Sequence, residues 1–193
     1  MMGRKNRFTI WVTLGVLILP VLGLLAQVGA DNPLKNAKVG EWVEFVTKTQ
    51  TMGQSMEVKS KQTVVAKDAT SVTLRTEMTV MGKKTSTETK IPLNQPYEPY
   101  KMGLPENVKF TVTPLGSGSE TVTVGGKAYA CKWTKVKVVM TAPTAMDSTS
   151  KVWVCPDVPV TGMVKMETDS TIAAGGMTMN TKTVMEITGS GGR

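Results

Sequence analysis

The chain has 193 residues, a formal net charge of +8 and no histidine. A length in this range fits one domain. Without histidine there is no Ser-His-Asp or Cys-His nucleophile pair, no histidine-ligated zinc and no imidazole base that titrates near neutral pH.

Residues 1–30 have the composition of a secretory signal peptide. Three basic residues lie within the first seven positions, an apolar run extends from Phe8 to Ala26, and the small residue Ala30 precedes a polar segment. This order predicts export, to the periplasm or the exterior, with cleavage after Ala30. Residues 31–193 are then a single domain. The alternative is an uncleaved membrane anchor, because the run is close to the ~20 residues that a span needs.

Removal of the first 30 residues leaves 20 basic and 15 acidic residues, a net charge of +5. Almost all the remaining cations are lysines spread along alternating segments, and Arg75 and Arg193 are the only arginines among them. Nucleic-acid recognition favours arginine and interleaved aromatic residues, so nucleic acid is not an expected partner.

The rest of the chain is rich in Thr and Val and alternates between apolar and polar residues with a period of two, which is typical of strands. Four pairs of alternating segments flank a two-residue turn that contains glycine, as hairpins do. These are 41–51 and 54–66 around Met52-Gly53, 72–80 and 85–91 around Met81-Gly82, 119–124 and 127–140 around Gly125-Gly126, and 162–173 and 177–188 around Gly175-Gly176.

The last of these turns also predicts a register. A two-residue loop pairs apolar residues near both ends of the hairpin and hydroxyl residues between them. The predicted pairs are Ala174 with Met177, Ile172 with Met179, Ser170 with Thr181, Thr168 with Thr183, Met166 with Met185, and Val164 with Ile187.

Two proline-containing stretches interrupt the hairpins. Residues 92–106 carry four prolines with Tyr97 and Tyr100 between them, and residues 141–149 surround Pro143. Proline removes ladder donors, so both are predicted to be loops, the first lying on the sheet. About ten strands follow, in an all-β antiparallel meander that curls into a half-barrel or a barrel. A two-sheet sandwich is the alternative.

Cys131 and Cys155 are the only cysteines. An even count in an exported protein favours a disulfide. Both residues are equally far from Pro143, so a hairpin centred there places them on facing strands, close enough to bridge. Two free buried thiols are the first alternative, and redox or metal chemistry is the second.

No catalytic constellation is found. The acidic residues lie mostly on the polar phase of strands, and nothing selects a pair for two-carboxylate hydrolysis. The glycine-rich turns do not open helices, so they predict no phosphate cradle. The chain is therefore predicted to be no enzyme and to hold no cofactor.

Methionine is the unusual residue, since twelve of the 14 lie after residue 30. Methionine can fill an irregular curved core, which is the favoured interpretation, or line a deformable apolar cavity for a lipid or acyl chain. A third interpretation is Cu(I) binding by thioethers, for which Met177 and Met179 lie on one face of a strand. The candidate ligand-binding residues are Met78, Met166, Met179 and Met185, with Tyr97 and Tyr100 in the proline-rich cover.

Three segments carry a family resemblance: Val39–Phe45, Val124–Cys131 and Lys151–Lys165. They resemble uncharacterised exported bacterial β-proteins related in shape to the half-barrels of the Lol-type lipoprotein carriers. The resemblance implies a curved sheet whose concave face holds acyl chains beneath a helical lid. No helix is predicted here, and the proline-rich stretch 92–106 would take the place of the lid.

These observations predict a non-enzymatic exported protein of the cell envelope. It is expected to bind an apolar ligand, such as a lipid or acyl chain, or a protein segment on a curved sheet. The alternative is a structural or interaction protein whose sheet is filled by its own side chains, and Cu(I) binding comes third. The expected partner is a lipid or an envelope protein, with membrane contact only through residues 1–30 if they are uncleaved.

Overall fold

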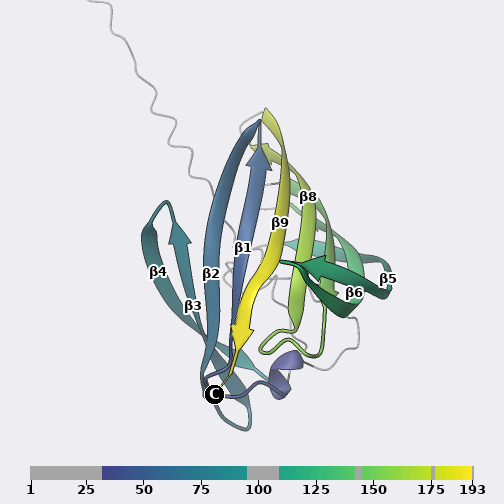
Figure 1. Ribbon diagram of the computed structural model, residues 1–193. Helices are drawn as coiled ribbons and strands as arrows, with labels where there is room; N and C mark the ends of the chain where they lie inside the picture. Colours follow the sequence, from purple (N-terminus) through teal and green to yellow (C-terminus); the bar gives the residue numbers. More distant parts are fainter. Residues whose placement is uncertain (1–31, 95–108, 142–144, 175–176, 193) are drawn as a thin grey trace, which may run out of the picture.

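The computed structural model describes residues 32–94, 109–141, 145–174 and 177–192 (Figure 1). The predicted signal peptide and both tyrosines of the proline-rich stretch lie outside these residues. The described part consists of one short 3₁₀ turn, η1, and nine strands. Their bounds are η1 Pro33–Lys35, β1 Trp42–Thr51, β2 Gln54–Lys67, β3 Ser71–Val80, β4 Lys83–Pro92, β5 Phe110–Val124, β6 Lys127–Met140, β7 Ala145–Val154, β8 Met163–Ala174 and β9 Met177–Gly191.

All nine strands belong to one antiparallel sheet with the order β4-β3-β2-β1-β9-β8-β7-β6-β5. Every neighbouring pair is a sequential hairpin except β1 and β9, which join the two halves of the chain at the centre of the sheet (Figure 1). β5 also contacts β9 across the three strands between them, so this half of the sheet curls. The predicted all-β curled meander is confirmed. The described residues form a single open sheet of nine strands, and not a closed barrel or a two-sheet sandwich.

The four predicted hairpins are confirmed, and so are five of the six pairs predicted for the last of them. In the β8–β9 hairpin, Met166 pairs with Met185 and Ile172 pairs with Met179, as the two-residue loop requires. In the β6–β7 hairpin, Lys132 pairs with Val154, which is the register expected from a centre at Pro143. β5 begins well before residue 119, and a register shift between Pro114 and Gly116 allows the proline to lie within it.

The sheet has an inner face, which carries the buried residues, and an outer face. Near the lower end, where η1 and the end of β9 lie in Figure 1, the inner face is apolar and includes Phe45, Val164 and Met166. Leu34 of η1 belongs to the same core cluster. Burial of each such side chain contributes roughly 1.5–3 kcal/mol, so this cluster supplies most of the driving force for folding.

Both edge strands carry features that discourage pairing with another chain. β4 has exposed lysines at Lys83, Lys84 and Lys90, and β5 has Pro114 and the register shift beside it. Charged residues, prolines and bulges are the usual protection of a sheet edge. The described sheet is therefore built to end at β4 and β5.

Two hairpin turns contain methionine in a left-handed backbone conformation. Met52 has φ = 50° in the β1–β2 turn and Met81 has φ = 48° in the β3–β4 turn, each followed by a glycine with positive φ. These angles fit type I′ turns, which normally have Asn or Gly in the first position. A methionine there is strained, because its Cβ approaches the following carbonyl oxygen.

Replacement of Met81 by Asn is therefore expected to stabilise the protein. Asn tolerates the left-handed conformation, and the free energy of unfolding should rise by about 0.5–1 kcal/mol because part of the left-handed penalty is removed. Urea denaturation measures the change. Met81→Val is the control, since a β-branched residue should lower stability at the same exposed position. Equal stability of the three proteins would contradict the strained turn.

A single carboxylate organises the β2–β3 turn. Asp68 accepts hydrogen bonds from the backbone N–H groups of Thr70 and Ser71, each at 2.7 Å, and from both hydroxyl groups, each at 2.8 Å. These four donors, led by the Thr70 backbone N–H, hold the pKa of Asp68 well below its ordinary value. The ionised form of Asp68 thus stabilises the turn.

The lowered pKa predicts how stability changes in acid. The contribution of Asp68 is present above its unfolded pKa, about 3.9, and is lost as the pH falls below that value towards the lower folded pKa. Asp68→Asn should therefore destabilise the protein near neutral pH and make unfolding less dependent on pH below about 4. Denaturation at several pH values tests this. A variant with the unchanged acid dependence would show that Asp68 does not act through its charge.

Candidate functional site

The four predicted methionines share the inner face but are not one cluster. Met166 and Met185 face each other across β8 and β9 and are 0% and 6% exposed. Met179 is half-buried nearer the β8–β9 turn, and Met78 is half-buried on β3, with β2 and β1 between it and β9. Because Met166 is fully buried, no space for a water molecule remains beside it. At this level the sheet is filled by its own side chains.

Between the Met166–Met185 pair and Met179, the inner face carries hydroxyl groups. Ser150 and Thr168 lie 2.8 Å apart, Thr49 and Thr183 3.3 Å apart, and Thr51 and Thr181 3.0 Å apart, oxygen to oxygen. Buried hydroxyl groups need such partners, since leaving one unpaired costs about 1–3 kcal/mol. The inner face is therefore apolar near the lower end, carries hydroxyl groups at mid-height, and is apolar again at Ile172 and Met179 next to the β8–β9 turn.

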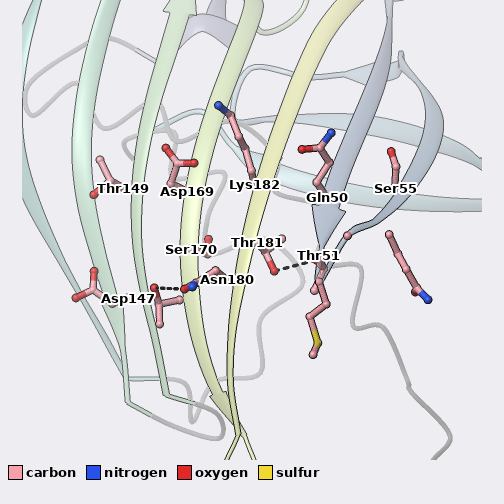
Figure 2. Close-up of a pocket in the computed structure, with 14 residues that line it drawn as sticks. Gln50, Thr51, Ser55, Asp147, Thr149, Asp169, Ser170, Asn180, Thr181 and Lys182 are labelled. Carbon is pink, nitrogen blue, oxygen red and sulfur yellow. Dashed lines mark hydrogen bonds between the residues drawn. The ribbon is translucent and has the colours of Figure 1, made fainter.

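A pocket with a volume of about 690 Å³ lies near the upper end of the sheet (Figure 2). Its lining is almost entirely polar. The lining residues are Gln50, Thr51, Met52, Gly53, Gln54, Ser55, Asp147, Thr149, Asp169, Ser170, Thr171, Asn180, Thr181 and Lys182.

The register explains why these residues meet. Thr149 pairs with Asp169 across β7 and β8, Asp169 with Lys182 across β8 and β9, Lys182 with Gln50 across β9 and β1, and Gln50 with Ser55 across β1 and β2. Figure 2 shows this row. Asp169 and Lys182 alternate along their strands with the buried Thr168 and Thr183, so the row belongs to the outer face.

The pocket offers both signs of charge to a ligand. Asp147 is ion-paired with Lys137 at 2.8 Å, and the Thr171 hydroxyl donates to the Asn180 side-chain oxygen at 3.1 Å. Asp169 and Lys182 face each other, and among the described residues neither takes part in an ion pair. The pocket is thus lined by two carboxylates, one ammonium group and three amides, and Asp147 is the carboxylate that is already ion-paired.

Sequence reasoning missed this pocket. It placed Asp169 on the solvated phase of its strand, which is correct, but gave it no neighbours beyond its own hairpin. Only the Asp169–Lys182 pair follows from the β8–β9 turn. The contributions of Gln50 and Ser55 depend on the pairing of β1 with β9, which joins distant parts of the chain.

A second outer-face cluster has a structural explanation. The ammonium group of Lys151 lies 4.5 Å from the ring centroids of both Trp133 and Trp153. Glu120 accepts a hydrogen bond from Lys151 at 2.9 Å and another from the Trp153 indole N–H, and these donors hold the pKa of Glu120 below its ordinary value. A Cβ on Gly118 would lie 2.9 Å from the Trp133 ring, so glycine is needed there. The charges and rings in this cluster satisfy one another.

The cysteines are buried in the core cluster beside the β6–β7 hairpin. Both are free thiols in the structure, and the disulfide stays a prediction. Burial, followed by the proximity of Cys155 and Glu120, raises the pKa of the Cys131 thiol to about 11. No group of three or more Cys, Asp or Glu side chains arranged to hold a metal ion is present within the described residues.

The comparisons with known proteins give no relative. No protein-family description, no curated protein and no solved structure matches the chain. In the described part of the chain, no helix is long and apolar enough to cross a membrane. The resemblance to Lol-type carriers therefore stays an expectation.

The raised pKa of Cys131 predicts slow thiol chemistry. In a reduced Cys155→Ser variant, Cys131 should react with Ellman's reagent more than about tenfold more slowly in the folded than in the unfolded protein. Burial, the largest cause of the raised pKa, persists when the contribution of Cys155 is removed, and it also limits access to the thiol. Stopped-flow absorbance with and without denaturant measures both rates. The Cys131→Ser variant gives the same comparison for Cys155. Equal rates would contradict burial of the thiol.

Proposed function

We propose that this chain is an exported, non-enzymatic binding protein of the cell envelope, and that it holds a small zwitterionic ligand in the outer-face pocket. The observation that carries this proposal is the row of Asp169, Lys182 and Gln50, which presents opposite charges and an amide side by side. Export is supported by the composition of residues 1–30.

A zwitterion matches the charges of this row. Lys182 would contact the anionic group of the ligand and Asp169 its ammonium group, while Gln50 and Asn180 provide amide donors and acceptors. The pocket is open and its charged residues are exposed, so each charged hydrogen bond contributes only about 1.5–3 kcal/mol at best. We therefore expect dissociation constants in the range of about 10 μM to 10 mM.

Binding rather than catalysis is favoured by the environment of the carboxylates. Asp147 and Asp169 lie on the adjacent strands β7 and β8 in the pocket, and glycoside hydrolases use a pair of carboxylates. A hydrolase needs one of them buried enough to stay protonated. Here both are exposed, and Asp147 is ion-paired with Lys137.

The sequence-based proposal of an apolar ligand is the second candidate. Met78 and Met179 are half-buried on the inner face, so apolar surface remains there outside the filled centre. Native mass spectrometry after gentle extraction tests it: a co-purifying lipid lost in Met78→Gln and Met179→Gln variants would support it. A protein that carries no lipid would contradict this candidate and would show that the inner face is filled by its own side chains.

The proposed pocket is tested with two probes, O-phosphoethanolamine and glycylglycine, and with glucose as an uncharged comparison. Titration followed by amide NMR should give saturable shifts around Gln50, Asp169 and Lys182 with the zwitterions. The double variant Asp169→Asn, Lys182→Gln should weaken binding by about 10–100-fold, because two charged contacts are lost.

A matched control exists on the same face. Lys48 and Glu57 face each other across β1 and β2, one row below the pocket, and neither lines it. Lys48→Gln with Glu57→Gln removes the same charges and should leave the titration unchanged. Equal weakening in both double variants, or no saturable shift with either zwitterion, would contradict the proposal.

A further inference from the structure

Three hairpin turns at the upper end carry exposed methionines, which we call the methionine rim: Met52, Met81 and Met177. They are 75%, 92% and 62% exposed. Met52 lies in the β1–β2 turn, Met81 in the β3–β4 turn, and Met177 begins β9. β1, β3 and β8 run in the same direction, so all three turns lie at one end of the sheet (Figure 1).

Folding does not account for these residues. Met52 and Met81 occupy left-handed positions that strain a methionine, and neither side chain contributes to the core. Exposed apolar side chains also increase the tendency to aggregate. Residues that are unfavourable for the turn and for solubility, repeated at one end of the molecule, point to contact with something outside the chain.

The charge of the three turns indicates what kind of surface the methionine rim contacts. Residues 51–55, 80–84 and 177–179 contain no carboxylate, and their only charged residues are Lys83 and Lys84, directly after Met81 and Gly82. Apolar side chains next to lysines are suited to a bilayer surface, where methionine enters the headgroup region and lysine meets lipid phosphates. Anionic lipids satisfy both features at once.

We propose that the methionine rim docks this domain, end on, onto a lipid bilayer that contains anionic lipids. The three turns belong to separate hairpins, with β2 and β1 between the β3–β4 and β8–β9 pairs, so they meet a broad surface better than a single narrow groove. This extends the sequence-based expectation, which allowed membrane contact only through residues 1–30. The docking does not depend on the ligand of the outer-face pocket.

The experiment reads which end of the sheet meets the bilayer, because residues 1–30 can also bind membranes in the full chain. An environment-sensitive NBD label is placed at Gln54→Cys, in the β1–β2 turn, or at Ala69→Cys, in the β2–β3 turn at the other end of β2. Both positions are exposed, whereas Cys131 and Cys155 are buried. With vesicles of phosphatidylglycerol and phosphatidylcholine, the label at residue 54 should shift to the blue and brighten. The label at residue 69 should not change.

The rim is then altered by Met52→Asn, Met81→Asn and Met177→Thr. The first two changes suit the turns, so the variant should melt at least as high as the parent, and loss of binding cannot be attributed to unfolding. The response at residue 54 should require at least 10-fold more lipid. Lys83→Gln with Lys84→Gln should weaken binding to anionic vesicles by about 5–25-fold, since each lysine near such a surface contributes roughly fivefold.

Three results would overturn the proposal: no response at residue 54, equal responses at both ends, or unchanged binding by the rim variant. A response at residue 54 to a soluble envelope protein and not to vesicles would show that the rim is a protein interface instead. The pocket variant Asp169→Asn, Lys182→Gln should dock normally. Failure of docking and failure of ligand binding are therefore distinguishable.

Discussion

The pairing of β1 with β9 is the interaction on which the rest of the structure depends. It unites the first and last strands over the whole length of β1, from Trp42 opposite Gly191 to Thr51 opposite Thr181. Without it the chain would be two meanders, β1 to β4 and β5 to β9, each with another unprotected edge. Because it closes a loop of more than a hundred residues, this pairing carries the largest chain-entropy loss of any contact in the sheet. Phe45 and Ile187, opposite each other on the inner face, provide the apolar burial that offsets it.

The local half of the fold could be predicted from the sequence, and the long-range half could not. Each Gly-containing turn determines its own register, which is why the pairing of Met166 with Met185 follows from residue spacing. The β6–β7 register agrees with a hairpin centred on Pro143. No local signal specifies that β1 meets β9. The same limit applies to the pocket, where Asp169 and Lys182 belong to one hairpin while Gln50 reaches them only through β1 and β9.

Methionine illustrates how one residue type has different roles in one sheet. Met166, on the inner face at the centre of the sheet, is a filler of an irregular core, which the sequence favoured. Met81, in a turn with positive φ, touches no core and strains its own backbone. Sequence alone groups the two because the alternation shows only which face of a strand a residue occupies. The exposed fraction of the side chain and the backbone φ distinguish Met81 from Met166, because a turn residue belongs to neither face of the sheet.

The distribution of polarity along the sheet separates stability from recognition. The lower end contains the apolar cluster around Phe45 and Met166, together with η1. Because such cores are closely packed, substitutions that change side-chain volume there lower stability. Above this cluster the inner face carries a band of paired hydroxyls. Towards the upper end the outer face forms the polar pocket and the turns expose methionine. The β1–β2 turn contributes to the pocket and to the rim through the same residue, Met52. A ligand in the pocket and a surface against the rim would therefore meet on one hairpin, which places any coupling between the two within a single turn of the chain.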